Sequence, residues 1–163
     1  PFSKFLLNWL IMGDELVPIL KDVIACEDLK KYETAFYEYE LKCNVPPSVK
    51  FDYAVALIRS EYSADIIRGI SLMDEIISNT KGSKKEFFYL KAIGLAKLKE
   101  YKRALSCCDT ILRVEPECRQ TRNLESYINR KMRKDGLTGM GIVAAAAGTV
   151  LATAWICKAL IKK

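Results

Sequence analysis

The chain has 163 residues, of which half are apolar and 28% are charged, and it carries a net charge of +6 with no histidine. This length suits one domain with an appendage, and the charged fraction is that of an ordinary globular protein. The missing histidine excludes Ser/His and Cys/His dyads and mixed Cys/His zinc sites. A phosphate-binding GxxxxGK[ST] motif is also missing. We therefore expect a protein that is not an enzyme and that uses no cofactor or metal.

Much of the excess positive charge lies near the C-terminus, instead of following one face with interleaved aromatic side chains. Nucleic-acid binding requires basic residues along one face with interleaved aromatic side chains, so we expect no nucleic-acid partner. The six cysteines show no C-x-x-C spacing. They are expected to be reduced, structural residues of a cytosolic domain.

The first eleven residues, 1–11, are not expected to belong to the folded domain. The chain begins with Pro1, and its apolar run FLLNWLIM contains Asn8 and is too short to span a bilayer. We expect residues 1–11 to be an extension or a fragment end, with the folded domain starting at Met12. A signal-like apolar segment is the alternative.

Helical periodicity follows, interrupted at Pro46-Pro47, at Lys81-Gly82-Ser83 and at Pro116. Ser48 is a candidate N-cap after the two prolines, and Ser83 with Glu86 fits a capping box. Strand patterns are weak, so the fold class is expected to be all-α. The pattern predicts six helices, at about 29–42, 48–61, 64–79, 83–99, 101–114 and 117–134.

Two segments of the chain repeat one another. RGISLMDEI at 68–76 matches RALSCCDTI at 103–111 at an offset of 35 residues, close to the 34-residue period of tetratricopeptide repeats. Small residues at Gly69 and Ala104 let paired helices approach closely, and Pro116 stops the last helix of the second copy. We predict a six-helix bundle with two tandem tetratricopeptide-like repeats, at 48–80 and 83–116. The helices at 29–42 and 117–134 would cap them.

The C-terminal run from Leu137 to Cys157 holds no charged residue, and its length of about 20 residues is what a membrane-spanning helix needs. We predict a transmembrane tail anchor at 137–157, a short basic tail at 158–163 and a cytosolic domain at 12–134. Small residues spaced by four in the span leave self-association through this helix open. The basic residues flanking the membrane are expected to be Arg130, Lys131, Arg133, Lys134, Lys158, Lys162 and Lys163.

Five stretches together resemble the mitochondrial fission 1 protein family: CEDLKKYETAFYEY, FDYAVALIRSEY, DIIRGISLMDEI, YLKAIGLAKLKEYKRAL and KMRKDGLTGMGIV. The resemblance implies a tail-anchored protein of the mitochondrial outer membrane, also found on peroxisomes. It implies recruitment of a dynamin-related GTPase, directly or through adaptor or Rab-regulating proteins. The chain departs from the family at Lys91, which follows Tyr89-Leu90, and at Ala96 and Lys97, where the family has an aromatic residue and an arginine.

The partner is expected to bind a concave groove between the helices at 48–61 and 83–99. Each groove residue has the alternative of packing in the core. An import or chaperone-docking receptor is the alternative function, although these two helices lack the Asn that a carboxylate clamp uses. The predicted groove residues are Tyr53, Leu57, Ile58, Ser60, Tyr89, Ile93 and Lys97.

Overall fold

The computed structural model describes residues 23–136. The chain divides into two compact units, residues 1–128 and 129–163, and each is considered by itself. The predicted extension at 1–11, the anchor at 137–157 and the basic tail at 158–163 lie outside the described residues. Among the helices between residues 23 and 136, none combines the length and the apolar character that crossing a bilayer requires.

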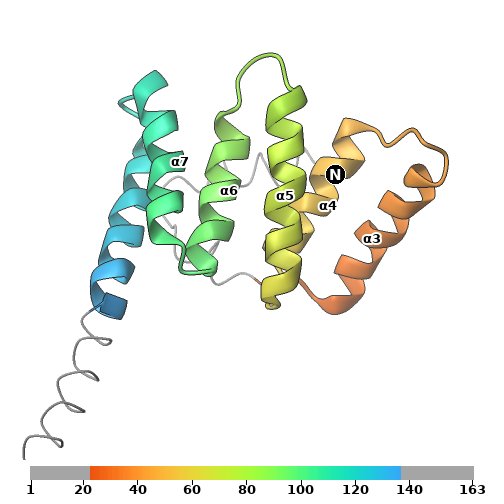
Figure 1. Cartoon of the computed structure of the whole chain (residues 1–163), viewed down its shortest axis with the longest axis horizontal. Helices are drawn as coiled ribbons and strands as arrows, with labels where there is room; N and C mark the ends of the chain where they lie inside the picture. The colour runs from red at the N-terminus through yellow and green to blue at the C-terminus, as the bar shows by residue number, and fades with distance from the viewer. Residues whose placement is uncertain (1–22, 137–163) are drawn as a thin grey trace, which may run out of the picture. The chain divides into compact units, whose positions relative to one another are not determined.

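Residues 23–136 form six helices and no strand, which confirms the all-α class. Figure 1 shows the labelled helices following one another across the molecule, each packed against the next. Helix α4 also contacts α6, although α5 separates them in the sequence. The helices are α3 (Cys26–Glu40), α4 (Pro47–Ile58), α5 (Ser63–Asn79), α6 (Lys85–Lys97), α7 (Tyr101–Val114) and an unlabelled helix at 119–136.

Two predicted helix caps are wrong. Helix α4 has Pro46 at its N-cap and Pro47 at its first position, so Ser48 lies inside the helix instead of capping it. Proline suits the first turn because its fixed φ is already helical and its missing N–H would have had no intrahelical acceptor. Helix α6 has Lys84 at its N-cap, so the predicted capping box of Ser83 and Glu86 does not form.

The repeat alignment holds in three dimensions. Helix α5 packs on α4 as α7 packs on α6. Gly69 and Ala104, which the alignment pairs, are both buried, and a Cβ at Gly69 would lie 2.9 Å from the carbonyl oxygen of Ala54. Met73 and Cys108, also paired by the alignment, are both fully buried. The small residue of each second helix therefore sets a close approach to the first helix of its repeat.

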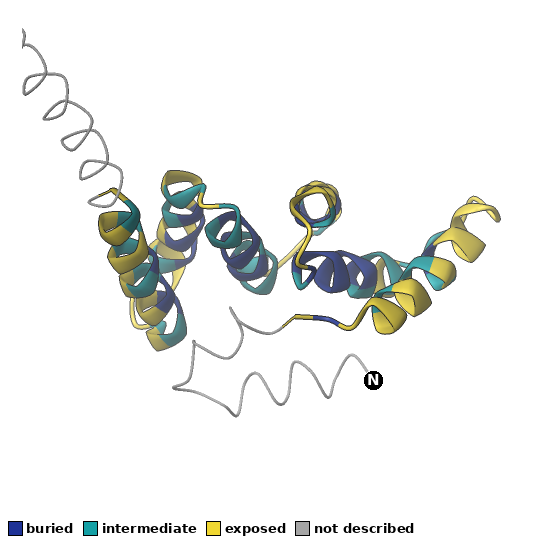
Figure 2. Cartoon of the chain, turned by 90° about the horizontal axis from the view of Figure 1, so that it is seen from below, coloured by how far each residue is buried: buried dark blue, intermediate teal, exposed yellow. Residues whose placement is uncertain are grey.

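The core runs along α4, and Figure 2 shows this helix as mostly buried, whereas α3 is largely exposed. Residues 53–58 are buried without interruption, because α4 is covered by α3, α5 and α6. At the far end of the first unit, Thr121, Leu124 and Ile128 have no exposed surface, and Leu124 and Ile128 belong to the hydrophobic core. The helix that begins at residue 119 thus covers the second repeat, as a capping helix must.

Candidate functional site

The structure brings the predicted groove residues together on α4, the turn after it and α6, but places most of them inside the protein. Only Lys97 is half-buried. The other side chains pack in the core, which is the alternative that the sequence left open, and their part in partner binding stays a prediction. Exposed fractions of 3% or less are found for Tyr53, Leu57, Ile58, Ser60, Tyr89 and Ile93.

Tyr53 joins three helices. Its ring packs on Phe36 of α3 with a centroid distance of 4.8 Å, and its hydroxyl donates to the Glu33 carboxylate at 3.4 Å. The Arg68 guanidinium of α5 lies 5.5 Å from the ring centroids of both Tyr53 and Tyr37. Burial raises the pKa of Tyr53 to about 12. The phenol therefore stays neutral near pH 7 and serves to hold α3 and α5 on α4.

Ser60 and Lys97 organise the end of α4. The Ser60 hydroxyl donates to the Asp65 carboxylate at 2.6 Å and accepts the backbone N–H of Tyr62 at 3.2 Å. The Lys97 ammonium donates to the backbone carbonyls of Ile58 at 3.1 Å and Ser60 at 3.3 Å. These contacts fix the turn between α4 and α5 and attach it to α6.

Lys91, the departure in α6, has a structural partner. Its ammonium forms an ion pair and hydrogen bond with the Asp74 carboxylate of α5. The residues before it, Tyr89 and Leu90, are 2% and 8% exposed, so both face the core. The lysine thus sits at the α5–α6 contact, where its charge is paired at a half-buried position.

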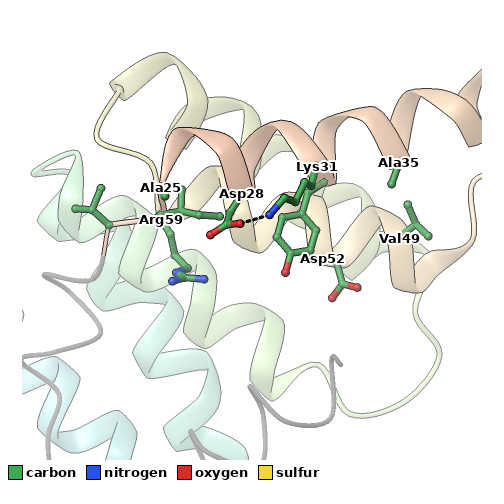
Figure 3. Close-up of a pocket in the computed structure, with 10 residues that line it drawn as sticks. Ala25, Asp28, Lys31, Ala35, Val49, Asp52 and Arg59 are labelled. Atoms are coloured by element: carbon green, nitrogen blue, oxygen red, sulfur yellow. Dashed lines mark hydrogen bonds and ion pairs between the residues drawn. The ribbon is translucent and has the colours of Figure 1, made fainter.

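A pocket of about 750 Å³, which no pattern in the sequence predicted, opens between α3 and α4. Figure 3 shows side chains from both helices converging on it. The segment before α3 also reaches it, since the Ile24 N–H donates to the Arg59 carbonyl at 3.2 Å. The lining residues are Val23, Ile24, Ala25, Asp28, Lys31, Tyr32, Ala35, Val49, Asp52 and Arg59.

The predicted membrane-flanking basic residues complete the candidate residues. Arg130, Lys131, Arg133 and Lys134 are all exposed on the helix at 119–136, whereas Lys158, Lys162 and Lys163 lie outside the described residues. Within the described part of the chain, no group of three or more metal-ligating side chains comes together.

Two family models match the chain. The Fis1 N-terminal tetratricopeptide repeat covers residues 48–80, and the Fis1 C-terminal tetratricopeptide repeat covers residues 85–137. These ranges hold the two helix pairs α4–α5 and α6–α7, together with the helix at 119–136. Both models describe tetratricopeptide repeats, so this is a repeat-protein family and not an enzyme family.

Solved structures give the same fold. The yeast Fis1 structure in complex with an Mdv1 fragment matches with a TM-score of 0.66 at 24% identity, over 75% of this chain and 98% of that one. The crystal structure of Fis1 from Saccharomyces cerevisiae matches with a TM-score of 0.66 at 22% identity, over 74% and 93%. At such identities, the likeness establishes the fold alone.

Curated relatives establish the family as well as the fold, because their sequence identity to this chain is higher. The mitochondrial fission 1 protein of Mus musculus is 42% identical over 133 residues, which cover 79% of this chain and 86% of the relative. The protein of the same name from Homo sapiens is 41% identical over the same shares. On this evidence, and on the two repeat models, the chain belongs to the mitochondrial fission 1 protein family.

Proposed function

We propose that this chain is a membrane-tethered adaptor of mitochondrial fission. The observation that carries the proposal is its 42% identity to a mitochondrial fission 1 protein over most of both chains. The yeast Fis1 structure, solved in complex with an Mdv1 fragment, supports protein recruitment as the task of this fold. The proposed partner is a dynamin-related GTPase, or the adaptor or Rab-regulating proteins that act with it.

The test is complementation in cells whose own mitochondrial fission 1 protein is deleted. The full chain should shorten the mitochondrial network and raise the amount of dynamin-related GTPase on mitochondria, measured by imaging. A chain of residues 1–136 should leave the network long, because it lacks the proposed anchor at 137–157. A network that stays long with correctly localised full chain would contradict the adaptor role.

The proposed localisation of the protein is the mitochondrial outer membrane, and also peroxisomes. It rests on the uncharged run at 137–157 and on basic residues on both sides of it. Replacing Lys158, Lys162 and Lys163 with glutamine should divert the protein to the endoplasmic reticulum. Unchanged mitochondrial localisation would show that these three charges are not the targeting signal.

The proposed partner surface lies along α4 and α6, the first helix of each repeat. These two helices contact each other, and stacked repeats present such helices to an extended binding surface. Because Leu57 and Tyr89 are buried, Leu57→Ala/Tyr89→Ala tests this surface only where circular dichroism shows an intact fold. With an intact fold, we expect loss of recruitment while the protein stays on mitochondria.

If the double variant unfolds, Lys97→Met tests the same surface, since Lys97 is half-buried and has a polar end. Recruitment that is unchanged in every folded variant would remove α4 and α6 from the proposal. It would leave the family assignment intact.

A further inference from the structure

The pocket between α3 and α4 combines apolar walls with charges that are unequally paired. Asp28, Lys31, Tyr32 and Ala35 present one face of α3 to it, since positions i, i+3, i+4 and i+7 lie on the same side of a helix. The Lys31 ammonium is 2.8 Å from the Asp28 carboxylate, so these two charges satisfy one another. Figure 3 shows this pair near the middle of the pocket, with Asp52 further along it.

Asp52 is the exception in this pocket. It is half-buried on α4, and burial raises the pKa of its carboxyl group. Within residues 23–136, no hydrogen bond or ion pair reaches this carboxylate, and the influence that opposes burial on its pKa is the positive charge of the chain's N-terminus. A carboxylate partly removed from water without a donor is destabilising, because its lost hydration is not replaced. A cation that entered the pocket would give this carboxylate a hydrogen-bond donor.

The walls near Asp52 suit the stem of a long basic side chain. Tyr32 lines the pocket and is 41% exposed, and an aromatic ring attracts an ammonium or guanidinium group. Val49 and Ala35 also line the pocket and provide apolar contact for methylene groups. The volume of about 750 Å³ leaves ample room for one such side chain.

We propose that this pocket binds a lysine or arginine side chain of a partner segment, with its charged end at Asp52 and its stem against Tyr32 and Val49. An acidic side chain fits less well at this end of the pocket, because it would lie beside the Asp52 carboxylate, and like charges repel. The two cations of the lining are Lys31, which is paired with Asp28, and Arg59, whose charge also acts on Asp28. The inference rests on the proposed adaptor function only for the existence of a partner. The binding of the side chain itself is independent of it.

The probes are three matched tripeptides, acetyl-Leu-X-Leu-amide, in which X is lysine, norleucine or glutamate. The full chain is held in detergent micelles with ¹³C-labelled aspartate carboxyl groups, and the Asp52 signal is followed by NMR. The lysine peptide should shift this signal saturably and lower the pKa measured for Asp52, because a nearby cation favours the carboxylate. The norleucine and glutamate peptides should bind at least tenfold more weakly.

Three variants control the experiment. Asp52→Asn keeps the shape of the side chain and should weaken the lysine peptide at least tenfold in a binding titration. Asp52→Glu should restore most of the binding. Asp109→Asn changes an exposed carboxylate on α7 and should leave binding unchanged. If Asp52→Asn does not fold, the comparison of lysine with norleucine on the unaltered chain still decides the matter.

Equal binding of the lysine and norleucine peptides would overturn the proposal, and so would tighter binding of the glutamate peptide. Binding of the lysine peptide that is unaffected by Asp52→Asn would also overturn it. Failure of the proposed adaptor function would give a different set of results. In that case the lysine peptide still binds at Asp52, while the full chain does not shorten mitochondria in the deletion cells.

Discussion

The ammonium nitrogen of Lys97, at the end of α6, lies 3.1 Å from the carbonyl oxygen of Ile58, the last residue of α4. The last carbonyls of a helix lack intrahelical donors, and they carry the negative end of the helix dipole. Lys97 supplies both a donor and a positive charge at this end, from a helix of the other repeat. The first and second repeats are therefore joined by a polar contact as well as by apolar packing.

Lys97→Met should lower the free energy of unfolding by about 1–2 kcal/mol, because it removes this donor and charge but keeps the length of the stem. Chemical denaturation of the full chain in micelles measures the change. Lys102→Met is the matched control, since Lys102 is exposed on α7, and it should change stability by about 0.5 kcal/mol or less. Equal effects of the two substitutions would contradict a special role for Lys97.

Gly69→Ala should also destabilise the protein. A Cβ at this position would lie 2.9 Å from both the Ala54 carbonyl oxygen and the Leu57 Cβ, so α5 would have to move away from α4. The cost of such overpacking is roughly 1–3 kcal/mol. This cost exceeds the gain of about 1 kcal/mol that alanine gives a helix over glycine. A lower midpoint of thermal unfolding is the expected result.

Gly136→Ala provides the contrast. This glycine is also helical, and an added Cβ would meet no atom within 4 Å. The substitution should therefore leave stability unchanged or raise it by up to about 1 kcal/mol. A stabilising Gly69→Ala would mean that the close approach of α4 and α5 is looser than the structure shows.

Ala104→Leu tests the second repeat in the same manner. Ala104 has no exposed surface, so the extra carbons would have to displace the neighbouring helix at a cost of roughly 1–3 kcal/mol. Ala64→Leu is the control, because Ala64 is exposed in the first turn of α5. Unchanged melting of Ala104→Leu would show that the alignment of the two repeats is wrong at this residue.

The sequence could predict the repeats because their signal is redundant. Gly69 and Ala104, Met73 and Cys108 occupy equivalent buried positions, and the same apolar period appears twice. The helix starts were harder to predict, because a cap depends on one residue. Ser48 competes with two prolines, and proline at the first helical position prevailed, so the start moved to Pro47.

The pocket could not be predicted for a different reason. Asp28, Lys31 and Tyr32 are polar or amphipathic, so their helical spacing adds nothing to a search for apolar periodicity. The pocket also needs the segment before α3 to return to the end of α4, where Ile24 donates to the Arg59 carbonyl. That contact links residues far apart in the sequence, and no local pattern encodes it. The burial of Tyr53 likewise follows from three helices meeting on α4.

The cysteines provide a prediction about reactivity. Burial raises the pKa of the Cys108 thiol to about 12 and also raises that of Cys107. Because the thiolate is the reactive form, neither residue should be alkylated at pH 8 faster than the chain opens. Cys26 and Cys43 are exposed and should react first. Mass spectrometry of peptides from iodoacetamide-treated full chain, sampled over time, measures each site.

The same shift makes stability depend on alkaline pH. The folded pKa of Cys108 lies above its ordinary value of 9.0, so between pH 9 and about 12 the folded chain keeps a proton that the unfolded chain has lost. Stability should therefore fall as pH rises above about 9. Cys108→Ala should reduce this fall, although its smaller side chain lowers stability at pH 7. Alkylation of Cys108 as fast as Cys43, or an equally steep alkaline loss in Cys108→Ala, would show that this thiol is not held neutral by burial.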